Sequence, residues 1–290
     1  MDQKPILGIV GGSGLYAMED LDNQRTENIT TPFGNPSGPY LVGELHGTTL
    51  VFLPRHGQGH VLSPSEVNYR ANIHGFRQLG VRQLISVSAV GSLREDIHPG
   101  DMVLPDQFFD RTKSRQSTFF GQGAVVHVPF GDPVCPVLMQ ALRSVLDDMG
   151  VTCHAGGTYV CMEGPVFSTR AESNFYRSIG ASVIGMTALP EAKLAREAEM
   201  CYATLALSTD YDCWHESEKN VDANAVLEVL ARNIDTARAA ISSLASRMPF
   251  QGECLCNHSL DGALLTTPKH VPAETRKKLS LLAGRFFDNL

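Results

Sequence analysis

Short apolar runs rich in β-branched residues alternate with helical patterns along this chain, and this alternation is the strongest constraint on its fold. The runs at residues 6–10, 83–89 and 202–210 each end in glycine or polar residues, which is typical of strands buried in a sheet. Residues 67–79 and 223–245 show the apolar spacing of helices. Further strands are expected at residues 157–162 and 183–186, and further helices at 136–149, 169–179 and 190–199. Such alternation predicts an α/β fold.

The early part of the chain adds an antiparallel feature. Residues 41–45 and 48–53 are strand-like and flank His46-Gly47, which indicates a hairpin. The predicted fold class is therefore an α/β three-layer sandwich around a mixed β-sheet. Residues 1–250 are expected to form one domain. Residues 251–290 are expected to form an irregular segment and a final helix that pack on the same domain or on a neighbouring subunit.

Charge and hydropathy exclude several classes of partner. The 290 residues carry a formal net charge of -7 and a pI of about 5.8, which argues against nucleic acid and membrane surfaces. No apolar run approaches the roughly 20 residues that span a bilayer, and the first residues lack the apolar core of a signal peptide. A cytoplasmic protein is expected, and a local cluster of donors can still bind a small anion.

The seven cysteines are scattered, which is mostly the pattern of reduced core thiols. Cys254-Leu-Cys256 is the exception, and it can be a redox pair, a short-range disulfide or two ordinary thiols. The ordinary thiols are favoured, with a structural disulfide as the second choice. Because no second pair of cysteines or histidines stands at zinc spacing, no metal is expected.

Two carboxylates stand two residues apart where an apolar run ends, in Thr209-Asp210-Tyr211-Asp212-Cys213-Trp214. In an extended chain, residues i and i+2 point to the same side, so Asp210 and Asp212 are expected to converge on one spot. Such a pair can hold a ring that offers both a donor and a nitrogen to protonate, as an aminopurine does. The alternative interpretation is a pair that caps a helix or a turn.

Other predicted strand ends carry donors that suit an oxyanion. Gly11-Gly12-Ser13-Gly14 opens the backbone toward a ligand, and Arg55-His56 offers a planar fork and a second donor. Ligands of open α/β sheets gather at such ends. The cradle predicted for phosphate is made of Ser13, Arg55, His56, Ser88 and Thr187. Ordinary turns remain the alternative. Met186 offers an apolar surface for a sugar, and the turn at 163–168 can present Phe167 to a planar base or bury it in the core.

Together these segments resemble the methylthioadenosine phosphorylase branch of the purine nucleoside phosphorylases. The matching pieces cover most of residues 6–245 in order. They are Gly-Gly-Ser-Gly-Leu (11–15), Arg-His-Gly (55–57), Pro-Ser-Glu-Val-Asn-Tyr-Arg-Ala-Asn-Ile (64–73), Gly-Ser-Leu-Arg-Glu-Asp-Ile-His-Pro-Gly-Asp (91–101), Asp-Gln-Phe-Phe-Asp-Arg-Thr (106–112), Glu-Gly-Pro-Val-Phe-Ser-Thr-Arg-Ala-Glu-Ser (163–173), Met-Thr (186–187), Pro-Glu (190–191) and Thr-Asp-Tyr-Asp-Cys-Trp (209–214).

The resemblance implies phosphorolysis of 5′-methylthioadenosine to adenine and 5-methylthioribose 1-phosphate, with inorganic phosphate as co-substrate and no cofactor. It implies a homotrimer or a dimer of trimers. It adds Ala89 to the phosphate cradle through its backbone N–H. It implies a substrate pocket made of Val90, Phe167, Ser168, Met186, Asp210, Asp212, Ala223, Val226, Leu227 and the His127 of a neighbouring subunit.

The carboxylate pair decides between this activity and its nearest alternative, a 6-oxopurine nucleoside phosphorylase. A carboxylate accepts from the 6-amino group of adenine and repels a 6-oxo group. Asp210 is expected to protonate N7 of the leaving base while Asp212 binds the amino group, and the two roles can be exchanged. A nucleosidase that uses water and a non-catalytic nucleotide sensor are the remaining alternatives.

Overall fold

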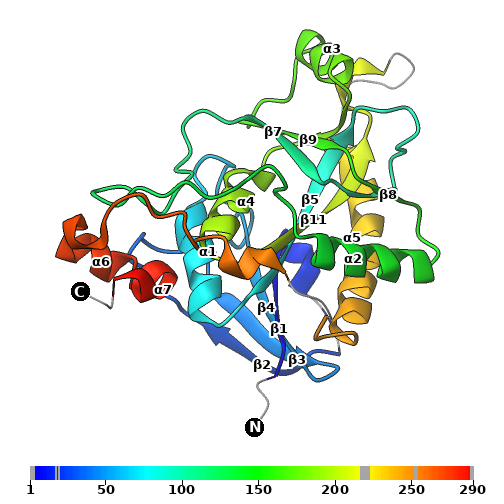
Figure 1. Ribbon diagram of the computed structural model, residues 1–290. Helices are drawn as coiled ribbons and strands as arrows, with labels where there is room; N and C mark the ends of the chain where they lie inside the picture. The colour runs from blue at the N-terminus through cyan, green and yellow to red at the C-terminus, as the bar shows by residue number, and fades with distance from the viewer. Residues whose placement is uncertain (1–3, 17, 19, 216–222, 251–253, 288–290) are drawn as a thin grey trace.

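In the computed structural model, a mixed sheet runs through the centre of the molecule (Figure 1). The structure describes residues 4–287 except 17, 19, 216–222 and 251–253, and the side chains of Ser13 and of residues 223–227 are also outside this description. Across the described residues, the sheet has eleven strands. They are β1 (Ile6–Gly11), β2 (Asp22–Glu27), β3 (Tyr40–Leu45), β4 (Thr48–Pro54), β5 (Gln83–Ser92), β6 (Met102–Leu104), β7 (Gln107–Arg111), β8 (Cys153–Ala155), β9 (Thr158–Met162), β10 (Ala181–Gly185) and β11 (Cys201–Asp210).

Four strands at the centre of the sheet are parallel. They are β4, β1, β5 and β11, joined in that order. Their carboxyl ends therefore meet at one edge, where Gly11, Arg55, Ser88 and Asp210 arrive from separate parts of the sequence. Strand β10 instead pairs antiparallel with the end of β5. This antiparallel pair brings residues after β10 back toward the same edge.

Helices cover both faces of the sheet. They are α1 (Tyr69–Gln78), α2 (Pro136–Asp148), α3 (Arg170–Ser178), α4 (Ala188–Glu197), α5 (Ala223–Ala245), α6 (Ala273–Lys278) and α7 (Ser280–Ala283). Figure 1 shows α2 and α5 on one side of the sheet and α1, α4 and the C-terminal helices on the other. Along β11, Leu205 and Leu207 belong to one hydrophobic core while Tyr202 and Ala206 belong to the other. This alternation buries both faces, and it confirms the predicted α/β sandwich around a mixed sheet.

The predicted hairpin joins β3 to β4 as an antiparallel pair. His46 and Gly47 both adopt positive φ, 51° and 81°, which is the backbone that a two-residue turn between twisted strands requires. Four strands were not expected from the sequence. Strand β2 is polar and mostly exposed, β6 and β8 have three residues each, and β7 lies in a stretch without a clear alternation.

The C-terminal segment packs on its own chain. The single helix expected near its end is divided into α6, α7 and a 3-10 turn, because Leu279 leaves helical geometry at ψ 4°. Leu279, Leu282 and Phe287 are buried in the same hydrophobic core as Phe33 and Phe119 of the main body. Over the described residues, no helix has the length and apolar character needed to cross a membrane.

Candidate active site

A cavity of about 430 Å³ opens at the edge of the sheet where the parallel strands end. Its walls come from the ends of β1, β4, β5, β10 and β11 and from helix α5, which lies across the opening. Of the residues predicted from the sequence, the cavity is lined by Arg55, His56, Ser88, Ala89, Val90, Phe167, Met186, Thr187, Asp210 and Asp212. Residues as far apart in the sequence as Arg55 and Asp212 thus converge as the strand-end argument predicts.

The two aspartates reach the cavity by a different geometry from the predicted one. Asp210 is the last residue of β11, but Asp212 begins a 3-10 helix, η2 (Asp212–Trp214), and has φ 52°. The expectation that strand alternation aligns both carboxylates is therefore wrong. A turn aligns them instead: Asp212 N–H donates to Asp210 Oδ1 at 2.8 Å, and Thr209 Oγ1 donates to Asp210 Oδ2 at 2.8 Å. Positive φ in a non-glycine residue stores strain, and such strain concentrates at functional sites.

Burial makes this carboxylate pair unusual in its protonation. Burial raises the pKa of Asp210, and burial together with the negative charge of Asp210 raises the pKa of Asp212. Asp212 Oδ2 is buried and makes no hydrogen bond of regular geometry to the described residues, although the nearby Ser173 hydroxyl offsets part of the rise in its pKa. Gly91 allows this approach, because a Cβ there would lie 3.0 Å from Asp210 Oδ1 and 3.3 Å from Asp212 Cβ. The base of the cavity therefore holds an acceptor without a regular hydrogen bond, beside a carboxyl group that retains its proton to higher pH than usual.

Hydroxyl groups gather at the other end of the cavity. Ser88 Oγ is buried and makes no hydrogen bond of regular geometry to the described residues, although the Tyr159 hydroxyl lies nearby. Thr187 precedes α4 and makes no side-chain capping bond to that helix. Both Thr187 and Ser88 line the cavity, and the antiparallel pairing of Ile184 with Gly91 directs the chain after β10 back along β5 toward Ser88. A buried hydroxyl without a regular hydrogen bond is costly, so this end of the cavity is prepared for a polar ligand.

Arg55 lines this end, but most of its donors are already used. Its side chain is 2% exposed and forms a two-pronged ion pair with Glu191, from Nε to Oε2 at 3.0 Å and from Nη2 to Oε1 at 3.1 Å. Nη1 donates to the carbonyl of Val87 at 3.0 Å, and Nη2 also donates to Ser86 Oγ at 2.7 Å. The sequence predicted a free fork for an oxyanion. The structure shows that the fork is occupied by Glu191, so Arg55 can offer a ligand at most the remaining N–H of Nη1.

His56 is held in one tautomer by the backbone. Its Nδ1 lies 2.9 Å from the carbonyl oxygen of Leu62, which can only accept, so Nδ1 carries the hydrogen. Burial and the nearby Arg55 charge lower the pKa of His56 to about 4. The ring is therefore neutral at physiological pH and presents Nε2 as an acceptor. The sequence interpretation expected a second donor here; the structure shows instead that the Nδ1 hydrogen is used by the Leu62 carbonyl and that Nε2 can accept.

The middle of the cavity is apolar. Ala89, Val90, Met186 and Phe167 all line it, and Phe167 is 59% exposed. The Met186 carbonyl accepts from Arg115 Nη1 at 2.6 Å, and Arg115 also donates to the carbonyls of Leu189 and Glu163 at 2.7 Å each. Arg115 thereby fixes the loops that carry Met186 and Phe167. An exposed aromatic ring in an apolar part of the cavity fits a planar base.

Some predicted residues are not brought to the cavity. Ser168 turns its hydroxyl toward Met162 Sδ at 3.8 Å, and its carbonyl accepts from the Cys213 thiol. His127 is exposed and lies outside the lining of its own cavity. The side chains of Ser13, Ala223, Val226 and Leu227 are outside the described residues, although Gly12 and, on helix α5, Leu230 and Ile234 line the cavity next to them.

Two supporting residues escaped the sequence interpretation. Glu191 is 1% exposed and neutralises Arg55, while Arg115 holds three backbone carbonyls. A charged residue within the mostly apolar pattern of 188–197 was the available signal for Glu191. Arg115 lies in a stretch without regular secondary structure, and nothing in its local sequence indicates burial.

The comparisons with known proteins identify the family of the chain. The model of the phosphorylase superfamily matches residues 6–246, and the chain belongs to that family. A relative from Geobacter sulfurreducens, an S-methyl-5'-thioadenosine phosphorylase, is 53% identical over 97% of this chain and 99% of its own length. A crystal structure of a methylthioadenosine phosphorylase from an Antarctic soil metagenomic library has a TM-score of 0.92 at 50% identity, covering 97% of this chain and 99% of that one.

A more distant structure contains adenine. The methylthioadenosine phosphorylase of Schistosoma mansoni in complex with adenine has a TM-score of 0.80 at 36% identity, and the match covers 84% of this chain and 91% of that one. The family and fold predicted from the sequence are thereby confirmed.

Proposed function

We propose that the protein catalyses the phosphorolysis of 5′-methylthioadenosine to adenine and 5-methylthioribose 1-phosphate, a salvage reaction of purine and methionine metabolism. The observation that carries the proposal is a pair of buried groups without regular hydrogen bonds in one cavity: the Asp212 Oδ2 acceptor at one end and the Ser88 hydroxyl at the other. The first suits an amino group on a base and the second suits an oxyanion. Relatives at about half identity carry the name of this activity.

At the base end, the carboxylates divide the work. Asp212 Oδ2 accepts from the 6-amino group of adenine, which satisfies the buried acceptor. Burial raises the pKa of Asp210, which favours its acid form, and in this proposal Asp210 donates a proton to N7 as the glycosidic bond lengthens and negative charge gathers on the base. Asp210 Oδ1 and Oδ2 already accept from Asp212 N–H and Thr209 Oγ1, so its orientation is fixed before the substrate binds.

At the phosphate end, hydroxyl and backbone donors hold the anion under C1′. Ser88, Thr187 and the Ala89 N–H supply donors, together with the one Nη1 hydrogen of Arg55 that no described residue accepts. His56 Nε2 accepts from the protonated oxygen of hydrogen phosphate. The bound anion stabilises the positive charge that develops on the sugar and then attacks C1′. In this proposal, phosphate is a co-substrate and no cofactor takes part.

The 5′ end of the substrate is assigned to helix α5 and to a second subunit. Leu230 and Ile234 extend the cavity along α5, toward Ala223, Val226 and Leu227 on earlier turns of the same helix. His127 is exposed on its own subunit, so it is free to close the cavity of another. A homotrimer or a dimer of trimers is part of the proposal, and so is a cytoplasmic location, which suits seven scattered thiols.

A nucleoside panel tests the proposal. Methylthioadenosine, adenosine and inosine are each incubated with and without phosphate, and free base and sugar phosphate are quantified by chromatography. Methylthioadenosine should be cleaved only with phosphate, and inosine should be cleaved at least a hundredfold more slowly, because its 6-oxo group meets two carboxylates. Base release without phosphate would indicate a nucleosidase, and preferential cleavage of inosine would indicate a 6-oxopurine nucleoside phosphorylase. Either result would overturn the proposal.

A further inference from the structure

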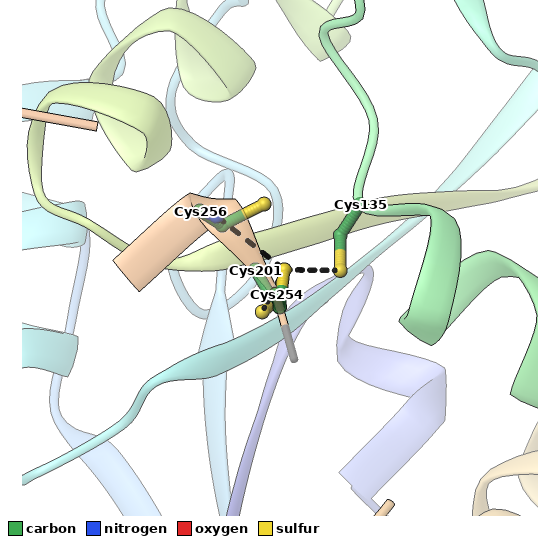
Figure 2. A group of neighbouring side chains, drawn as sticks. All are labelled: Cys135, Cys201, Cys254 and Cys256. Atoms are coloured by element: carbon green, nitrogen blue, oxygen red, sulfur yellow. Dashed lines mark hydrogen bonds between the residues drawn. The ribbon is translucent and has the colours of Figure 1, made fainter. Parts of the chain in front are cut away.

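Four of the seven cysteines converge at the end of β11 that is remote from the cavity (Figure 2). Their sulfur atoms all lie within 4.8 Å of one another. Cys254 Sγ lies 3.2 Å from Cys135 Sγ and 3.4 Å from Cys201 Sγ. The fourth member, Cys256, donates its backbone N–H to Cys254 Sγ at 3.4 Å. None of these cysteines forms a disulfide in the structure.

Three separate parts of the chain supply the cluster. Cys135 precedes α2, Cys201 begins β11, and Cys254 and Cys256 lie at the start of a 3-10 turn, η3 (Leu255–His258), in the C-terminal segment. Cys201 and Asp210 are the two ends of one strand, which places the cluster about 30 Å from the carboxylates at about 3.3 Å per residue. The cluster therefore takes no part in the nucleoside cavity.

The arrangement fits the geometry of a tetrahedral ion. Sulfur ligands lie about 2.3 Å from zinc, so four of them at tetrahedral corners lie about 3.8 Å from one another. The spacings in the cluster, from 3.2 Å to less than 4.8 Å, bracket this value. Cys135, Cys201 and Cys256 are at most 4% exposed, which shields such a site from solvent. We propose that Cys135, Cys201, Cys254 and Cys256 form a structural site for a soft divalent cation, with Zn²⁺ as the ion it takes.

The surroundings favour sulfur in its charged form. Cys135 stands at the N-terminus of α2, where backbone N–H groups lack intrahelical acceptors and the helix dipole favours negative charge. Binding Zn²⁺ as a tetrathiolate releases the thiol protons to solvent.

The cation would link the C-terminal segment to α2 and β11 in the main body of the protein. Four sulfur ligands leave no open coordination position, which is the pattern of a structural rather than a catalytic zinc. The ligands from α2 and β11 belong to the body, while the Cys254-Leu-Cys256 pair begins the segment that buries Leu279, Leu282 and Phe287. No zinc-site spacing is visible in the sequence, because the partners of Cys254 lie 53 and 119 residues away.

Metal content measured on the intact protein tests the site. The protein is expressed in medium with added zinc, purified without a metal-affinity step under reducing conditions, and analysed by inductively coupled plasma mass spectrometry. About one zinc per chain is expected. Cys135→Ser and Cys254→Ser should lose at least tenfold in zinc retention against a chelator, while Cys153→Ser and Cys213→Ser, which lie outside the cluster, should retain zinc as the unaltered protein does.

Cobalt provides a readout that needs no variant. Co²⁺ added to the zinc-free protein should give the visible absorption of a tetrahedral thiolate complex, and Zn²⁺ should displace it. Zinc removal should lower the melting temperature while the KM for methylthioadenosine stays unchanged, so failure here is distinguishable from failure of the proposed function. Absence of zinc together with seven free thiols, or a mass lower by two hydrogens per disulfide within the cluster, would overturn the proposal.

Discussion

The two ends of strand β11 are built for different kinds of occupant. At the carboxyl end, Asp210 and Asp212 are unlike their surroundings in charge, held by a strained turn, and open to a cavity with an unpaired acceptor. At the amino end, four sulfur atoms lie within 4.8 Å of one another, and three of the four cysteines are buried. An incomplete set of polar partners suits a ligand that enters and leaves. A set of four sulfur donors suits an ion that stays.

The largest effect is expected from the ion pair that lies beneath the cavity. Glu191→Gln leaves the buried charge of Arg55 without its counter-charge, and this should lower the free energy of unfolding by about 3–5 kcal/mol. Urea denaturation followed by circular dichroism measures the loss. Glu228→Gln, an exposed change on α5, should stay within about 0.5 kcal/mol. Equal stability of the two variants would show that Glu191 is not needed to hold Arg55.

The next largest effect is expected at the carboxylate end of β11 and should leave the thiol end unchanged. Asp210→Asn removes the proposed proton donor and should lower kcat for methylthioadenosine by about a hundredfold or more. Steady-state kinetics at saturating phosphate measures it, with the exposed Asp235→Asn as control. Zinc content should not change. Turnover within twofold of the unaltered protein would remove Asp210 from the chemistry.

Two histidines with lowered pKa values, one at the cavity and one in the core, predict how stability depends on pH. Burial is the main reason why the pKa of His56 and that of His74 are both about 4. Because the unfolded chain takes up these protons near pH 6.5 and the folded chain does not, stability should fall as pH drops from about 6.5 toward 4. His74→Phe should recover roughly 2 kcal/mol of the loss between pH 7 and 5. His56→Asn should flatten the same curve and also raise the KM for phosphate.

The outcome that contradicts this assignment is specific. The free energy of unfolding is measured by urea titration at each pH, with all other conditions constant. If the His74→Phe variant loses stability with falling pH as steeply as the unaltered protein, His74 is protonated in the folded state and its depressed pKa is wrong.

The smallest effect compares two serines on the same strand. Ser88 Oγ is unpaired and faces the cavity, whereas Ser86 Oγ accepts from Arg55. Ser88→Ala should raise the KM for phosphate about tenfold and leave stability nearly unchanged, because it removes a donor that only the ligand uses. Ser86→Ala should instead cost about 1 kcal/mol of stability. If Ser88→Ala leaves phosphate binding unchanged, the cradle is misplaced.

Regular elements were the part of the fold that the sequence could predict. Strands β1, β5 and β11 are continuous apolar runs, and the dipeptide His46-Gly47 indicates the turn of a hairpin. Local sequence patterns are therefore sufficient to predict these elements. Strands β6 and β8 have three residues each; β6 forms because it pairs with β11, and β8 forms because it pairs with β6. Pairing of that kind is decided by the tertiary structure and leaves no local pattern.

The site shows the same division between local and tertiary information. Strand ends with polar residues predicted which side chains gather at the cavity, and most of them do. What each side chain does there depends on neighbours that are distant in sequence. Glu191 occupies the fork of Arg55, and the Leu62 carbonyl sets the tautomer of His56. The turn that brings Asp212 beside Asp210 is likewise a property of the folded backbone.

The engagement of Arg55 by Glu191 has a consequence for the choice of anion. The Arg55 charge is already neutralised by Glu191, and the His56 ring is uncharged. The site therefore selects an oxyanion by whether it carries an O–H group rather than by its negative charge. Hydrogen phosphate and hydrogen arsenate each carry an O–H that can donate to His56 Nε2. Fully ionised sulfate has no hydrogen to donate, so its oxygen lone pair is repelled by the lone pair of Nε2. Sulfate should therefore be a poor competitor, and added neutral salt should disturb the binding of phosphate only slightly.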